Sequence, residues 1–99
     1  MKYVITWQQR GNATEEAQAR SLAVFNRWSP DQGTTFLQFV SRIDGGGGFA
    51  VVETQDPTLI ARDMAIFGAF FDMGVYPVLD IQEGAAISAS AIAFLQADT

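Results

Sequence analysis

The 99-residue chain contains no cysteine and no histidine. The lack of cysteine excludes disulfide bonds, thiolate zinc sites, iron–sulfur clusters and a cysteine nucleophile. The lack of histidine excludes Ser–His and Cys–His catalytic pairs, an imidazole base and a proximal haem histidine. Any catalysis would rest on Asp, Glu, Tyr, Arg or Lys, or on a cofactor held without histidine. We expect no cofactor and no metal.

Basic residues and long apolar runs are also scarce. The chain has six Lys and Arg against eleven Asp and Glu, which gives a net charge of −5, and the six are scattered along the sequence. No basic stripe exists for nucleic acid or an anionic membrane. Residues 1–10 become polar again at Gln8, too early for a signal peptide, and the apolar run 84–97 is too short for a bilayer core of about 30 Å. These features predict a cytoplasmic protein with neither nucleic acid nor membrane as a partner.

Apolar residues, by contrast, are abundant. They make up 48% of the chain, and eight of them are Phe. This composition excludes disorder, and the length predicts one domain over residues 1–99. Because a chain of this size buries only somewhat over ~60% of its unfolded surface, an unusually apolar exposed face would seek a partner.

The order of predicted elements indicates an α+β fold. Asn12 or Thr14 is expected to cap the first helix, and Asp56-Pro57 to start the second. Pro77 lacks an N–H group and places the last strand at an edge or a bulge. Strands are predicted at residues 2–8, 34–43, 49–54 and 74–81, and helices at residues 14–28, 57–70 and 83–96. The order is that of a ferredoxin-like βαββαβ fold, a four-stranded antiparallel sheet, with a C-terminal helix added.

Four consecutive glycines, residues 45–48, lie between two predicted strands. A phosphate-binding loop needs its glycines between a strand and a helix, so this run does not fit one. Asp44-Gly45 between apolar residues is instead typical of a β-hairpin. The strand that follows partly matches that of RNA-recognition domains, but the basic residue and two of the aromatic residues of that pattern are missing. We expect a turn.

Alternation along the strands predicts which side chains face away from the helices. The small side chains of Ala50, Val52 and Thr54 suit close helix packing. The opposite face is then expected to hold Tyr3, Ile5, Trp7, Phe36, Gln38, Val40, Arg42, Phe49, Val51, Glu53, Tyr76, Val78 and Asp80. Such a face is too apolar for water and too polar for a core, which predicts a homodimer with a ligand pocket between two facing sheets. An interface of this kind buries on the order of 1,600 Å² or more.

The segments FVSRIDGGGGFAVVET and PVLDI resemble a small bacterial family of uncharacterised single-domain proteins in the dimeric α/β-barrel superfamily. The resemblance covers nearly the whole chain and implies a ferredoxin-like fold and a dimer. The superfamily includes small monooxygenases, haem proteins and isomerases, so the resemblance implies no single reaction. The lack of histidine departs from the haem-binding members.

The candidate ligand-binding residues are Tyr3, Trp7, Gln38, Arg42, Glu53, Tyr76 and Asp80. Arg42 and Glu53 have two interpretations: a cross-strand ion pair, which we favour, or an anion site and a base. Asp80 and Tyr76 are either a proton-transfer pair or surface residues. We therefore expect a small apolar or aromatic ligand bound by a homodimer without catalysis. The alternatives are a cofactor-independent isomerase, cyclase or oxygenase, and a purely structural homo-oligomer.

Overall fold

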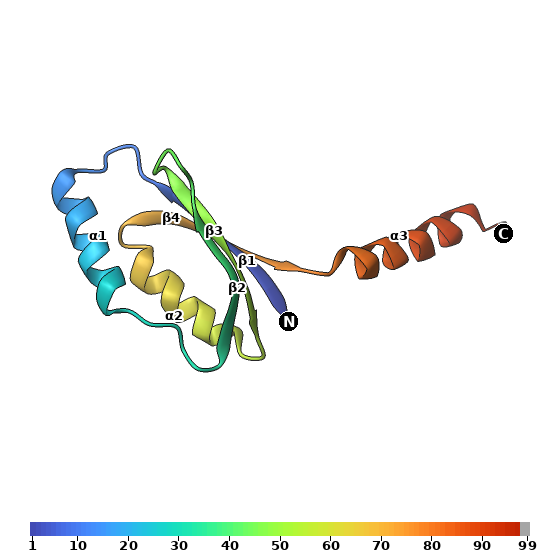
Figure 1. Cartoon of the computed structure of the whole chain (residues 1–99). Coiled ribbons are helices and arrows are strands. Elements are labelled where there is room, and N and C mark those ends of the chain that lie inside the picture. The colour runs from blue at the N-terminus through green and yellow to red at the C-terminus, as the bar shows by residue number, and fades with distance from the viewer. Residues whose placement is uncertain (98–99) are drawn as a thin grey trace.

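The computed structural model describes residues 1–97 and confirms the α+β ferredoxin-like fold. One four-stranded antiparallel sheet has the order β2-β3-β1-β4. Helices α1 and α2 lie on one side of it, which we call the helical face, and the other side is the open face (Figure 1). The elements in chain order are β1 (Lys2–Gln9), α1 (Glu15–Arg27), β2 (Thr34–Ser41), β3 (Gly47–Thr54), α2 (Pro57–Phe67), β4 (Phe71–Val78) and α3 (Ile81–Gln96).

Local sequence signals set the helix starts. The Thr14 side chain accepts a hydrogen bond from the Ala17 N–H at 3.1 Å, so Thr14 is the N-cap of α1. Asp56 caps α2 by accepting from the Thr58 N–H at 3.0 Å, and Pro57 follows it as the first helical residue. Of the two predicted caps of the first helix, Asn12 and Thr14, Thr14 is the one observed, and the predicted start of the second helix at Asp56-Pro57 is confirmed. Of the two positions that Pro77 predicted for β4, an edge or a bulge, the edge is observed.

The core lies between β1, β3 and α2. Its buried residues are Ile5, Ala50, Val52 and Ile60, and the partly buried hydrophobic residues packed against them are Tyr3, Trp7, Phe36, Met64 and Met73. The predicted face of β1 is therefore wrong, because its large residues point to the helical face. Ile5 pairs with Ala50 on β3 and with Val75 on β4, so Val4 and Thr6 occupy the open face instead.

A bulge in β2 changes which of its side chains face the helices. The pairing with β3 shifts between Phe36, opposite Val52, and Gln38, opposite Val51, which leaves Leu37 as the extra residue. A bulge reverses the alternation of side chains beyond it. Phe36 and Phe39 therefore lie on the same face, the helical one, and the assignment of Phe36 to the open face is wrong.

The glycine run forms the predicted hairpin between β2 and β3. Gly45 has φ +74°, a conformation in which glycine avoids the steric penalty of other residues. The Asp44 side chain accepts from the Gly46 N–H at 2.9 Å and so closes the turn. Gly48 lies directly beneath the Trp7 indole, and a Cβ there would overlap that ring and the Val40 carbonyl oxygen.

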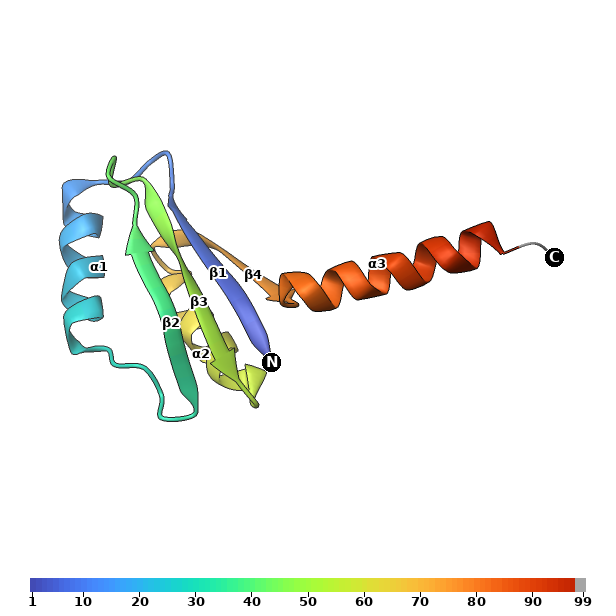
Figure 2. The same cartoon turned by 45° about the vertical axis from the view of Figure 1, so that its right-hand side comes forward.

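Helix α3 projects away from the rest of the molecule, on the side of the sheet opposite α1 and α2 (Figures 1 and 2). None of its residues is buried. The molecule measures 63 × 31 × 21 Å as a result, with a radius of gyration of 17.8 Å. Within residues 1–97 no helix has the length and hydropathy needed to cross a membrane.

Candidate binding cleft

An apolar cleft of about 610 Å³ separates α1 from α2 and the helical face of the sheet. Its volume falls in the range of pockets for small organic molecules, about 300–1,000 Å³. The side chains that line it are mostly aromatic or aliphatic. They include Ile5, Trp7, Leu22, Phe25, Trp28, Phe36, Phe39, Met64, Phe67, Phe71 and Met73, with Gln9, Gln18, Ser21, Ser41 and Asp63 as polar members.

Six ring-bearing residues form one continuous group, the aromatic cluster: Trp7, Phe25, Trp28, Phe36, Phe39 and Phe67. Trp28 meets Phe67 edge to face with ring centroids 5.4 Å apart, and Trp7 meets Phe39 in the same way at 5.6 Å. Such edge contacts contribute about 0.5–1.5 kcal/mol beyond area burial. The cluster joins α1, α2 and the sheet, and so forms one wall of the cleft.

Helix α1 covers the cleft without filling it. The helix buries none of its residues, and Leu22 and Phe25 remain 60% and 43% exposed. The side of α1 that faces the cleft carries Ser21, Leu22 and Phe25, and the small Ser21 side chain leaves space beneath the helix. A partly open apolar surface of this kind gains free energy where an apolar molecule displaces its water, by about 25 cal/mol per Å² of apolar area covered.

Asp63 is the one charged residue among those that line the cleft within residues 1–97. It lies on α2 and is 9% exposed, and the Trp28 indole N–H donates to its Oδ1 at 3.0 Å. Burial raises the pKa of this carboxyl, and the hydrogen bond from Trp28 only partly opposes that effect. Sequence reasoning missed Asp63, although its position between Ile60, Met64 and Phe67 on the buried stripe of α2 is a usable signal.

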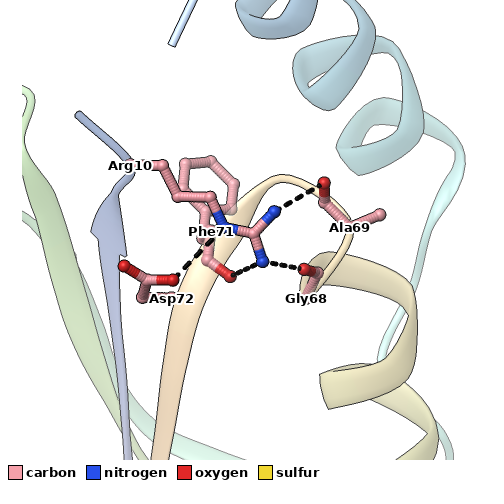
Figure 3. A network of polar contacts seen from close by, with 5 residues as sticks. All are labelled: Arg10, Gly68, Ala69, Phe71 and Asp72. Carbon is pink, nitrogen blue, oxygen red and sulfur yellow. Dashed lines mark hydrogen bonds and ion pairs between the residues drawn. The ribbon is translucent and has the colours of Figure 1, made fainter. Parts of the chain in front are cut away.

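Arg10 holds the far end of the cleft in place (Figure 3). Its guanidinium donates to the carbonyl oxygens of Gly68 at 2.6 Å, Ala69 at 3.2 Å and Phe71 at 3.3 Å, and to Asp72 Oδ1 at 3.2 Å. Gly68 is the C-cap of α2, so the Arg10 cation also lies at the negative end of the helix dipole. Arg10 therefore fixes the turn from α2 to β4, which carries Phe67 and Phe71 into the cleft wall.

The predicted ligand-binding residues divide between the two sides of the sheet. Trp7 lines the cleft, and Tyr3 packs against the core on the same side. Gln38, Val51, Val4 and Tyr76 pair in register across the four strands and form one row of the open face. Gln38 and Tyr76 lie at the two ends of this row, on the edge strands. The sheet therefore separates Tyr3 and Trp7 from Gln38 and Tyr76.

The predicted ion pair between Arg42 and Glu53 is wrong. Glu53 lies opposite Thr35 and Lys2, at the end of β3 far from the hairpin. Arg42 instead forms an ion pair with Asp44 inside the hairpin turn. The register of the hairpin explains why the two residues do not meet. Arg42 lies beside the turn, whereas Glu53 lies at the end of β3 farthest from it.

Asp80 does not belong to a strand, contrary to the prediction. It is the N-cap residue of α3, and its Oδ1 accepts from the Lys2 ammonium at 2.7 Å. This contact with Asp80 raises the pKa of Lys2. Asp80 thus ties the start of α3 to the first residues of β1. Within the described chain, no three acidic side chains gather as a metal ligand set.

Comparison with known protein families matches residues 1–92 to one family, described as a domain of unknown function, DUF3303. No curated protein and no solved structure shows significant similarity to the chain.

Proposed function

The chain belongs to the DUF3303 family, and we propose that it binds a small apolar or aromatic molecule in the cleft beneath α1. The observation that carries this proposal is the cleft itself: about 610 Å³ with an aromatic wall and only partly covered hydrophobic side chains. Closure of α1 onto the sheet would bury more apolar surface and stabilise the fold, so an open cleft points to a role beyond folding. The site lies within each chain, on the helical face, rather than between two facing sheets.

The single carboxyl group in the cleft narrows the ligand class. Asp63 accepts hydrogen bonds when ionised and disfavours a second negative charge nearby. The net charge of −5 adds to this selection against anions. We therefore assign the ligand to neutral or cationic molecules with an aromatic or aliphatic body and one hydrogen-bond donor, such as a phenol or an amine.

A fluorescence titration with N-phenyl-1-naphthylamine tests the proposal, because this probe is neutral, aromatic and has one N–H group. The wild-type protein should enhance its fluorescence and bind it saturably. The Ser21→Trp variant places an indole inside the cleft from α1. We expect it to weaken binding at least about tenfold, a change of roughly 1.4 kcal/mol.

The matched control is Ala23→Trp, which adds the same side chain two residues on, at an exposed position of α1 that does not line the cleft. This variant should bind the probe as the wild type does. Equal binding by Ser21→Trp, or an equal loss in both variants, would refute the cleft as the site. Circular dichroism of each variant confirms that the fold is retained.

A further inference from the structure

Helix α3 carries an apolar surface that no other part of its own chain buries. Successive residues of a helix are rotated by about 100°, which places all the large apolar side chains of α3 within an arc of about 160°. Those side chains are Ile81, Ile87, Ile92, Phe94 and Leu95, and each is at least half exposed. The opposite side of the helix carries Gln82, Glu83, Ala86, Ala89, Ser90, Ala93 and Gln96. We call the apolar arc of α3 the arm surface.

The open face of the sheet is the second surface without a partner. Its central rows contain Val4, Thr6, Gln38, Phe49, Val51 and Tyr76 and carry no charged residue. Phe49 is 40% exposed and Tyr76 is 56% exposed. Charged side chains lie at the margins of this face, where Lys2 pairs in register with Glu53 at one end and Gln8 pairs with Asp72 at the other.

We propose that the arm surface of one chain packs onto the open face of a second copy of this chain, and that the exchange is mutual. At 16 residues, α3 is only slightly longer than the isolated helices that are marginal in water, and packing of an apolar face supplies most helical stability in proteins. Each copy carries one arm surface and one open face. A twofold pair therefore satisfies all four surfaces at once, as a closed symmetric interface does.

The geometry at the end of β4 favours a second copy over the chain's own sheet. Only Leu79 and Asp80 join β4 to α3, Asp80 is extended at φ −60° and ψ 148°, and its carboxylate is held by Lys2. This connection directs α3 away from its own sheet, on the side that the open face also looks toward (Figure 2). A second sheet that faces the first lies on the same side as the arm.

The contact area reaches the lower limit of specific interfaces. A 16-residue helix is about 24 Å long and about 10 Å wide, so its footprint is about 240 Å². Two such helices, each covering one sheet, bury about 1,000 Å² in total when both sides of each contact are counted, which is about the minimum for a specific interface. Between Gly84 and Gln96 the helix has no charged residue, so the net charge of −5 does not oppose the contact locally. The inference goes beyond ligand binding and does not rest on it.

Sedimentation velocity of the full chain at micromolar concentration tests the inference. The wild type should sediment as a dimer. The double variant Ile87→Asp/Ile92→Asp places two charges on the arm surface and should dissociate it, with dimerisation at least about tenfold weaker. The matched double variant Ala86→Asp/Ser90→Asp adds the same charge to the opposite side of α3 and should remain dimeric.

Cross-linking distinguishes exchange between two chains from packing of the arm surface on its own sheet. The natural chain contains no cysteine, so introduced cysteines are the only reactive thiols. An Ile87→Cys chain mixed with an isotope-labelled Val51→Cys chain and a short bis-maleimide should give mixed covalent dimers. A wild type that sediments as a monomer would overturn the proposal. An Ile87→Asp/Ile92→Asp variant that still sediments as a dimer would also overturn it. So would a chain with both Ile87→Cys and Val51→Cys that forms only intramolecular cross-links. The naphthylamine titration is independent, since the arm variant retains the cleft.

Discussion

Asp63 is the residue that sets the polarity of the cleft. An ionised carboxylate that is 9% exposed is costly unless it is hydrogen-bonded, and the Trp28 indole N–H supplies that bond. The same bond holds the end of α1 to α2, because Trp28 directly follows the last residue of α1. Asp63 therefore links the packing of the cleft to its chemistry.

Replacement of Asp63 by Asn should change how stability depends on pH. Burial raises the pKa of Asp63 in the folded state above 3.8, so the folded chain favours its protonated form. The wild type consequently loses stability as pH rises from the ordinary Asp range through the raised pKa. The substituted asparagine side chain has no proton to lose and retains an oxygen that accepts from Trp28, so Asp63→Asn should melt a few degrees higher near neutral pH.

The check is thermal unfolding of both proteins, followed by circular dichroism across the acidic range. The difference in melting temperature should shrink as pH falls toward the ordinary Asp pKa. A difference that is constant with pH, or a less stable Asp63→Asn protein at neutral pH, would show that ionisation of Asp63 is not a cost in the folded state.

Single residues were the least predictable part of the site. Trp7 does line the cleft, but the prediction placed it on the opposite face, since alternation alone does not say which set of a strand is inward. In β1 both sets contain apolar residues: Tyr3, Ile5 and Trp7 on one side, Val4 and Thr6 on the other. Packing against Ala50 and Val52 on β3 determines which set faces inward. These residues are distant in sequence, so the β1 sequence alone does not predict the inward set.

The hairpin between β2 and β3 shows why residue 48 is a glycine. Gly48 is opposite Trp7 in the register, and the indole lies where a side chain at residue 48 would stand. Gly48→Ala should displace the Trp7 ring and destabilise the fold by about 1–3 kcal/mol, the usual cost of overpacking.

Chemical denaturation measures this cost, with Gly11→Ala as the control. A Cβ at Gly11 meets no atom within 4 Å, so that variant should unfold close to the wild type. Equal stability of Gly48→Ala and Gly11→Ala would mean that neither the Trp7 ring nor the Val40 carbonyl group limits the side chain at residue 48.

Elements with local signals were predicted well, and elements set by pairing less so. The caps Thr14 and Asp56 act within one turn of their helices. The sequence predicted Asp56 directly and offered Thr14 as one of two candidates, with Asn12. Strand β4 begins at Phe71, three residues before the predicted start at residue 74, because Gln9 at the end of β1 pairs with Phe71. The bulge at Leu37 is likewise set by the partner strand and has no clear sequence signature.

The order of elements over the whole molecule gave the fold, but not its shape. A compact chain of this length has a radius of gyration near 13 Å, and the observed 17.8 Å reflects the projecting α3. A helix was predicted at residues 83–96, but the prediction did not show what the helix packs against. The cleft therefore lies on the helical face, and the contact that we propose with a second chain lies on the open face.

The cleft as a ligand site is tested most directly by the two tryptophan indole N–H resonances of the wild-type protein. Trp7 and Trp28 are the only tryptophans in the chain, and both line the cleft. During titration with N-phenyl-1-naphthylamine, both indole signals should shift and saturate together, while the amides of Phe49 and Val51 on the open face stay in place. Shifts at Phe49 and Val51 with unmoved indole signals would contradict the account.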